Sequence, residues 1–185
     1  MSGSVRIFSL LTGLAVFALF SFKAIMSSSP PNLEITLSSP SIPPSFSDPL
    51  TLTFDVSVTN QGGSPATVLK WGSPLDERAN VLGVFEIRDV ESDEIVPLNS
   101  IKFNRQLPPP KEDFVEIASG GSVTAAVTIP LVPLVGGRSY TLKAKGWWQA
   151  VWERSLDDVP ESDLDQLKGA LRGEFVSEAV PVVEG

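Results

Sequence analysis

The sequence contains no cysteine and no histidine among its 185 residues. Without cysteine the chain has no disulfide and no thiol nucleophile, so an exported domain must be held together by its hydrophobic core alone. Without histidine it lacks the commonest zinc ligand and the usual general base at neutral pH. A serine nucleophile would need lysine or a carboxylate as its base, and no Ser-x-x-Lys motif occurs. We therefore expect no enzyme activity, no metal and no cofactor.

Basic residues are also scarce. The chain has 14 lysines and arginines against 22 aspartates and glutamates, which gives a formal net charge of −8. A surface of this sign repels nucleic acid and anionic lipid. Nucleic acid is therefore not an expected partner, and a membrane is expected only if an N-terminal anchor stays attached.

The longest apolar run, from Ile7 to Phe22, follows Arg6 and ends at Lys23. A positive segment before an apolar one is typical of a secretory signal, and the run is shorter than the roughly 20 residues of a spanning helix. Residues 1–27 are thus predicted to be a signal peptide of a secreted protein, with an uncleaved membrane anchor as the alternative. Residues 28–185 are predicted to form a single domain, since about 150 residues can bury a full core.

Many short stretches alternate apolar and polar residues, and glycine or proline corners separate them. This pattern predicts an all-β, immunoglobulin-like antiparallel β-sandwich of seven to nine strands. The stretches 50–59 and 66–71 are expected to pair as a hairpin or to lie as neighbouring strands, because Asn60–Gly63 separates them as a turn would. Other strands are predicted at 33–37, 84–88, 94–98, near 101–103, and at 123–129, 140–145 and 175–183, while residues 114–117 lead into the Gly120-Gly121 turn.

One short helix is predicted near the C-terminus, at residues 161–171. Its leucines follow helical spacing, Ser162 can cap its start, and Gly173 is expected to end it. The helix start is acidic, which could be explained by the helix dipole or, less simply, by a calcium site that does not match an EF-hand. The acidic residues are Asp157, Asp158, Glu161, Asp163 and Asp165.

Two motifs and a shorter stretch before them carry a family resemblance. The shorter stretch is Val-Thr-Asn-Gln-Gly at residues 58–62. The first motif is Val-Leu-Lys-Trp-Gly-Ser-Pro-Leu-Asp at 68–76, and the second joins Asp-Phe-Val-Glu-Ile at 113–117 to Gly-Gly-Ser-Val at 120–123. Together they resemble the N-terminal, propeptide-like domain of fungal deuterolysin-type metalloproteases over most of residues 33–145. The motif residues, which we expect to be structural, are Asn60, Gly62, Leu69, Lys70, Trp71, Gly72, Pro74, Leu75 and Asp76.

In those proteases the N-terminal domain is thought to assist folding or to restrain a catalytic domain with an H-E-x-x-H zinc helix. A chain without histidine cannot contain that helix. The resemblance therefore implies a non-catalytic, secreted protein-binding module, with a secreted peptidase as the candidate partner and inhibition or folding assistance as its role.

The segment from Trp147 to Gly173 departs furthest from the pro-domain pattern, and it holds Trp147, Trp148 and Trp152 close together. Aromatic rings beside polar groups can stack on sugars or anchor a protein partner. This supports an alternative function as a carbohydrate- or cell-wall-binding module. The competing interpretation is that the rings pack in the core.

Overall fold

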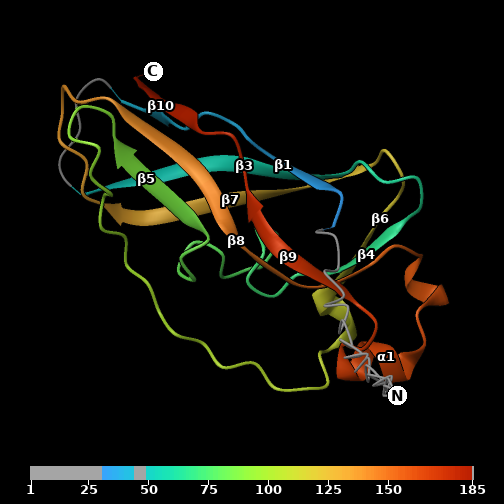
Figure 1. Cartoon of the computed structure of the whole chain (residues 1–185). Coiled ribbons are helices and arrows are strands. Elements are labelled where there is room, and N and C mark those ends of the chain that lie inside the picture. The colour runs from blue at the N-terminus through green and yellow to red at the C-terminus, as the bar shows by residue number, and fades with distance from the viewer. Residues whose placement is uncertain (1–30, 44–48, 185) are drawn as a thin grey trace, which may run out of the picture.

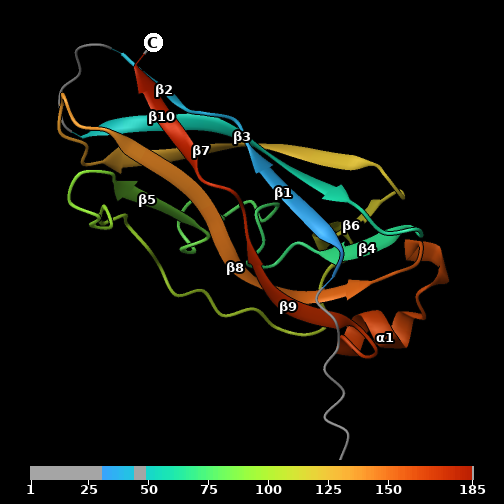
Figure 2. The same cartoon turned by 45° about the horizontal axis from the view of Figure 1, so that its top comes forward.

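The computed structural model describes residues 31–43 and 49–184, so the predicted leader at residues 1–27 lies outside the described residues. Two sheets face each other (Figure 1). The smaller sheet has the antiparallel order β1-β3-β7, with β3 in the middle (Figure 2). Its strands are β1 (Leu33–Leu37), β3 (Leu50–Asn60) and β7 (Ser122–Val132).

The larger sheet is organised around the 13-residue strand β8. The strand order of this sheet is β2-β10-β8-β4-β6, and β5 and β9 also pair with β8, so β8 pairs with four strands in all. All its pairs are antiparallel except β2 with β10. Its strands are β2 (Ser41–Ile42), β4 (Ala66–Leu69), β5 (Phe85–Asp89), β6 (Phe114–Ile117), β8 (Tyr140–Trp152), β9 (Leu171–Val176) and β10 (Val180–Glu184).

The main core lies between the two sheets. Strand β3 buries every second side chain, as a strand with one solvated face should. Phe54 from β3 meets Phe85 from β5 edge to face, with ring centroids 5.0 Å apart. Leu142, Ala144 and Trp148 of β8 belong to the same core. The all-β sandwich predicted from the sequence is confirmed.

A second, smaller core lies at the end of the sandwich that holds α1 (Glu161–Gln166) (Figure 2). It buries Trp71, Phe114 and Trp152, and the rings of Phe114 and Trp152 are 6.0 Å apart. Leu164 and Leu167 pack against it from the segment after β8. That segment therefore covers apolar surface, with help from a short 3-10 helix at Leu156–Asp158.

The strand pairing differs from the prediction in several places. Strands β3 and β4 do not form a hairpin: β3 pairs with β1 and β7, whereas β4 pairs with β6 and β8. The predicted strand at 94–98 is reduced to a single bridge between Ile95 and Arg88, and 101–103 is irregular. The segment predicted at 175–183 divides between β9 and β10. The described residues hold ten strands rather than seven to nine.

The helix is shorter than predicted. It ends at Gln166 because Leu167 adopts a left-handed conformation with φ of 52°. Gly173, expected to end the helix, instead lies inside β9. The leucine spacing that predicted a longer helix arises because Leu164 and Leu167 face the second core, while Leu171 begins the next strand.

Candidate functional site

The chain turns sharply after β4, and the carboxylate of Asp76 holds the turn. Gly72 has a positive φ of 64°, a conformation that glycine adopts without steric cost. The Oδ2 atom of Asp76 accepts a hydrogen bond from the Gly72 amide at 2.8 Å, and its Oδ1 atom accepts one from the Arg78 amide at 2.9 Å. The Asp76 side chain is only 3% exposed, so the turn closes around a buried charge.

Arg105 supplies the positive charge opposite Asp76. Its Nη2 atom donates to both carboxylate oxygens of Asp76, at 2.7 and 2.8 Å, and its Nη1 atom lies 3.7 Å from Oδ2 of Asp113. The same Asp113 oxygen accepts a hydrogen bond from Trp71 Nε1 at 2.5 Å. Charge-assisted hydrogen bonds of this kind fix both distance and direction. The two motifs behind the family resemblance thus meet through Trp71 and Asp113.

Beside this network lies a groove with aromatic, apolar and arginine walls and a volume of about 530 Å³. Phe103 is 43% exposed and Leu107 is 57% exposed. The guanidinium carbon of Arg105 lies 5.0 Å from the Phe103 ring centroid and 5.4 Å from that of Trp71. We call this feature the aromatic-arginine groove, and its principal residues are Trp71, Phe103, Arg105, Leu107, Gln149 and Leu167.

The groove joins three parts of the sequence that are far apart. Trp71 comes from the family motif, and Phe103 to Leu107 from the irregular segment before β6. Gln149 and Leu167 come from the segment between Trp147 and Gly173. The sequence pattern indicates a role for the first and third parts but not for the second, because a lone arginine in an irregular segment has no periodic signal.

Cations without acidic partners surround the groove. Arg78 stacks on Phe103, with its guanidinium carbon 3.9 Å from the ring centroid. Among residues 31–43 and 49–184, neither Arg78 nor Lys70 forms an ion pair, and the exposed Lys102 forms none either. Lys70 and Arg78 line a smaller hollow that shares Trp71, Phe103 and Arg105 with the groove, and the acidic residues Asp76, Glu77 and Asp113 line the same hollow. Because Asp76 and Asp113 are paired with Arg105, Lys70 and Arg78 can pair with anionic groups of a partner.

The remaining motif residues shape the scaffold. Asn60 is 3% exposed, and its Nδ2 atom donates to the carbonyls of Ser64 and Ile117 at 2.8 and 3.0 Å. Its Oδ1 atom accepts a hydrogen bond from the Gly62 amide at 2.9 Å. Leu69 lies in the second core and Leu75 in the main core, while Pro74 lies in the turn between them. The backbone amide of Lys70 donates a hydrogen bond to the Asp113 carbonyl.

The structure separates the three tryptophans that the sequence places together. Trp148 is 1% exposed and packs on Phe175 in the main core, with centroids 4.8 Å apart. Trp152 is 3% exposed, and its Nε1 atom donates to the Lys168 carbonyl at 3.0 Å. Trp147 alone of the three is exposed, at 46%. Neighbouring strand residues point to opposite faces, so contrary to expectation Trp148 and Trp152 add nothing to a binding surface.

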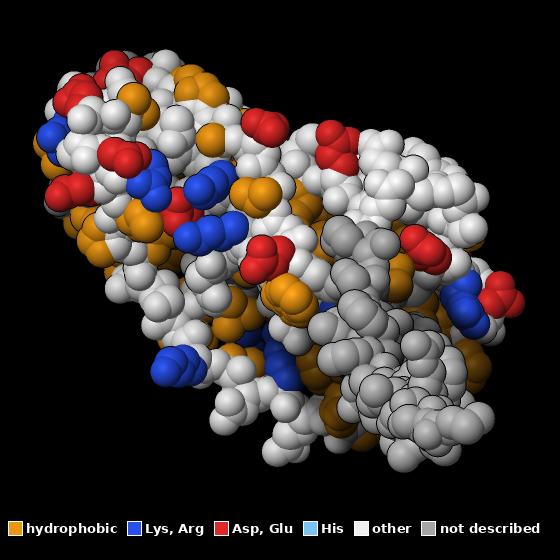
Figure 3. Space-filling model, in the orientation of Figure 1, with side chains coloured by type: hydrophobic (Ala, Val, Ile, Leu, Met, Phe, Trp, Pro, Cys, Tyr) orange, Lys and Arg blue, Asp and Glu red, His pale blue; other side chains and the backbone are white. Residues whose placement is uncertain are grey.

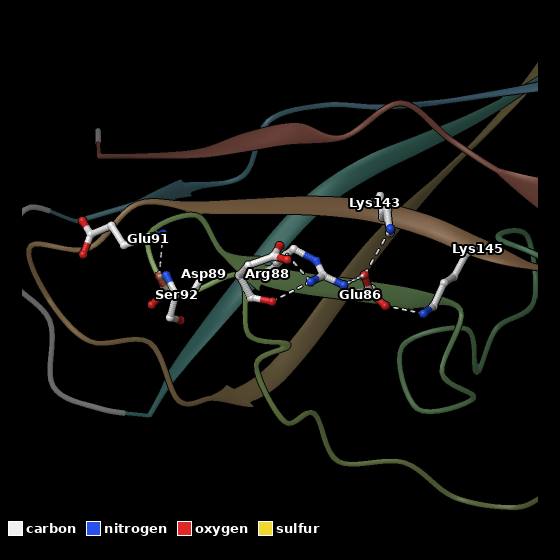
Figure 4. A network of polar contacts seen from close by, with 8 residues as sticks. Glu86, Arg88, Asp89, Glu91, Ser92, Lys143 and Lys145 are labelled. Carbon is white, nitrogen blue, oxygen red and sulfur yellow. Dashed lines mark hydrogen bonds and ion pairs between the residues drawn. The ribbon is translucent and has the colours of Figure 1, made fainter.

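A second charged cluster lies on the outer face of β5 and β8, where lysine and arginine side chains lie beside acidic ones (Figure 3). Glu86 lies between Lys143 and Lys145 and also contacts Arg88 (Figure 4). Its side chain is 3% exposed. Burial raises the pKa of Glu86, but hydrogen bonds from Lys145, Lys143 and Arg88 outweigh burial and bring the pKa down to about 2. Glu86 is therefore an anion at neutral pH.

The neighbouring turn after β5 is held by Asp89. Its Oδ1 atom accepts the amides of Glu91 and Ser92 at 2.9 and 3.1 Å, and Arg138 donates to its Oδ2 atom at 2.6 Å. Hydrogen bonding by Ser92 and Glu91, followed by the charge of Arg138, lowers the pKa of Asp89 against the opposing effect of burial. This acidic turn is thus a hydrogen-bonded corner.

The acidic residues around α1 do not converge. In the part of the chain that the structure describes, no group of three acidic side chains is placed to hold a metal ion. Ser155 Oγ lies 2.6 Å from Asp158 Oδ2, which fits a local turn contact.

Two facing, mostly antiparallel sheets with a solvated groove at one end define an immunoglobulin-like β-sandwich module. The model of the immunoglobulin-like domain family matches residues 32–183, and the chain belongs to that family.

A relative from Arthroderma benhamiae, described as an uncharacterized secreted protein, is 38% identical over 190 residues. The alignment covers 100% of this chain and 94% of the relative. The protein is secreted, as the sequence predicts. Among solved structures, the yjhA protein from Bacillus subtilis is similar with 15% identity and a TM-score of 0.32, over 81% of this chain and 93% of that one. The described residues include no helix that is long and apolar enough to cross a membrane.

Proposed function

We propose that this secreted protein is a non-catalytic protein-binding module and that the aromatic-arginine groove is its binding surface. The observation that carries this proposal is the exposed pair Phe103 and Leu107 beside Arg105, which the buried Asp76 holds in place. Aromatic and arginine side chains contribute most to the binding energy of protein interfaces. An arginine that is already fixed loses little conformational entropy when a partner binds.

The chemistry of the groove selects an acidic partner segment. Arg78 and Lys70 line the adjoining hollow, which shares Trp71, Phe103 and Arg105 with the groove, and they have no acidic partners among the described residues, so a carboxylate of the partner can pair with them. Phe103 and Leu107 supply apolar contact next to these charges. The proposed partner therefore presents a segment with an acidic side chain beside an apolar one.

The charged groups of the described residues support a role without catalysis. Glu86 is a buried anion under three cations and cannot donate a proton near neutral pH. Asp76 is occupied by Arg105 and two backbone amides. A general acid or base must reach its substrate, and both carboxylates are buried with 3% of the side chain exposed.

The resemblance to the deuterolysin pro-domain suggests a secreted peptidase as the partner. In this form of the proposal the groove binds an acidic segment of the peptidase, and binding restrains the enzyme or assists its folding. The motif residues Trp71 and Asp76 shape the groove, which links the resemblance to the surface.

The experiment is a calorimetric titration of the secreted protein into a deuterolysin-type peptidase, with a parallel assay of peptidase activity. We expect saturable binding that weakens in Phe103→Ala and in Arg78→Glu, since these changes remove the apolar contact and reverse the unpaired charge. Val135→Ala, at a position 57% exposed and outside the groove, is the matched control and should bind normally. No heat of binding at tens of micromolar protein, or equal binding by all variants, would contradict the proposal.

A further inference from the structure

Strand β7 is a long sheet edge with no charged side chain. It runs from Ser122 to Val132 at the outer side of the β1-β3-β7 sheet, and among the described strands it pairs with β3 alone. Proteins usually protect such an edge with charges, a bulge or a covering segment, because unpaired amides and carbonyls are a template for another strand. The sequence carries no charge from Ile117 to Gly137.

The ladder shows which backbone groups of β7 face outward. The Asn60 amide donates to the Gly121 carbonyl, so these opposed residues form a hydrogen-bonded pair, and every second pair along the ladder does the same. Ser122, Thr124 and Ala126 fall in the alternate positions, whose backbone groups point away from β3. The Thr128 carbonyl has the same phase and accepts a hydrogen bond from Asn80 Nδ2 at 2.8 Å. Thr128 is therefore covered, whereas no strand of the described residues pairs with the outward side of Ser122 to Ala126.

Two other strands, β9 and β5, are protected on their outward sides. The backbone groups of β9 that point away from β8 belong to residues that include the charged Arg172 and Glu174. The outer side of β5 is covered by residues 94–96, through hydrogen bonds from Asp89 to Glu94 and from Val96 to Ile87. The open part of β7 thus differs from these edges in both charge and cover.

We infer that β7 pairs antiparallel with β7 of a second copy of this chain and forms a symmetric dimer. Centring the pair on Thr124 places Thr124 opposite Thr124 of the second copy and Ser122 opposite Ala126. All three residues present outward amides and carbonyls, so each opposed pair can exchange two hydrogen bonds. The arrangement continues the small sheet from one copy into the other, which is a known mode of strand addition.

The side chains on the inner face fit this register. Val123 and Ala125 are only partly buried, although they point toward the core side. In the dimer each lies opposite the other, so pairing covers both. Thr128, where Asn80 lies, faces Gly120 of the second copy, which has no side chain to collide with Asn80. A hollow of about 360 Å³ separates residues 125–128 from the turn at residues 74–80 that carries Asn80.

Charge also favours a second copy at this edge. Each chain carries a net charge of −8, so two copies repel over most of their surfaces. The stretch from Ile117 to Gly137 itself brings no charge to the contact, and of the two acidic residues in the turn beside residues 125–128, Asp76 is paired with Arg105. Small side chains at Ser122, Thr124 and Ala126 let the backbones come within hydrogen-bonding distance.

The test is sedimentation velocity of the secreted protein over a wide range of concentration. We expect a reversible monomer-dimer equilibrium for the native chain and a monomer for Thr124→Lys, because the substitution places two lysines directly opposite each other. Thr51→Lys adds the same charge at an exposed position on the central strand β3 and should still dimerise. Phe103→Ala, which changes the groove and not β7, should also dimerise. The dimer and the groove can therefore be disproved separately.

A charge-reversal mixture makes the test specific. Thr124→Lys and Thr124→Glu should each be monomeric alone and should form a heterodimer when mixed, detected by tagging one of them. A native chain that stays monomeric up to about 1 mM overturns the inference. So does a dimer that persists in Thr124→Lys, or a mixture that forms no heterodimer while both variants melt like the native chain.

Discussion

The Asp76 carboxylate and the Arg105 guanidinium form a two-oxygen contact across 29 residues of sequence, at 2.7 and 2.8 Å. The contact ties the turn after β4 to the irregular segment that carries Phe103. It explains how a segment without helix or strand holds an exposed aromatic ring in a fixed place, since one end of the segment is anchored by a buried charge.

Asp76→Ala should destabilise the protein by roughly 2–4 kcal/mol, because it leaves Arg105 without its main partner and two backbone amides without an acceptor. Urea unfolding followed by tryptophan fluorescence measures the change. The control is Glu77→Ala at the exposed neighbouring position, which should stay within about 0.5 kcal/mol of the native chain. Equal effects of the two substitutions would show that the Asp76 contact adds no stability.

Gly146→Ala should be destabilising, although the residue is exposed. Gly146 lies directly opposite Phe175, and an added Cβ atom would stand 2.6 Å from Cζ of that ring. The ring is held by Trp148 and cannot move freely, so we expect a loss of about 1–3 kcal/mol. Thermal unfolding measures it. Gly136→Ala, where no atom lies within 4 Å of the added Cβ, should have little effect.

The two adjacent tryptophans should respond very differently to truncation. Trp148→Ala empties part of the main core and should cost about 3–5 kcal/mol. Trp147→Ala removes a ring that is 46% exposed and should cost much less. Denaturant unfolding of the pair, measured side by side, checks this prediction, and similar losses for both would contradict the placement of the rings on opposite faces of β8.

Acid should weaken the fold through Glu86. Its pKa falls from 4.5 to about 2 on folding, so the folded state favours the charged form. The resulting stabilisation is complete above pH 4.5 and is lost as the pH falls toward 2. Glu86→Gln should therefore be less stable than the native chain at neutral pH, with the difference shrinking below pH 4.5.

Melting temperatures from pH 7 to pH 2.5 measure this difference. Glu153→Gln, at an exposed position, is the matched control and should track the native chain at every pH. A constant gap between the native chain and Glu86→Gln across the acid range would show that the three cations do not stabilise the ionised carboxylate.

The sequence predicted the strands with strict alternation, such as β3 and the first half of β8, because a period of two survives when one face is solvated. Prediction from the sequence was wrong where tertiary contacts determine strand pairing or the end of a helix. The turn between β3 and β4 looks like a hairpin locally, yet the two strands enter different sheets. Leu167 ended the helix early because its side chain packs against the second core.

The groove could be predicted only in part. Trp71 and Asp76 were found through the motif, whereas Arg105 and Phe103 were not, because their partners lie tens of residues away and nothing in the local pattern links them. The sequence left open whether Trp147, Trp148 and Trp152 share a binding surface or pack in the core. The alternation rule alone, applied to adjacent residues in a strand, would have separated Trp147 from Trp148.

The two halves of β8 should tolerate polar substitutions to different extents. From Tyr140 to Ala144 buried and half-exposed positions alternate, so every second residue can change to a polar one. At residues 150–152 all three side chains are buried, with Val151 in the main core and its two neighbours in the second. A library of random substitutions should therefore recover polar residues at every other site in the first half of β8 and at none of the last three.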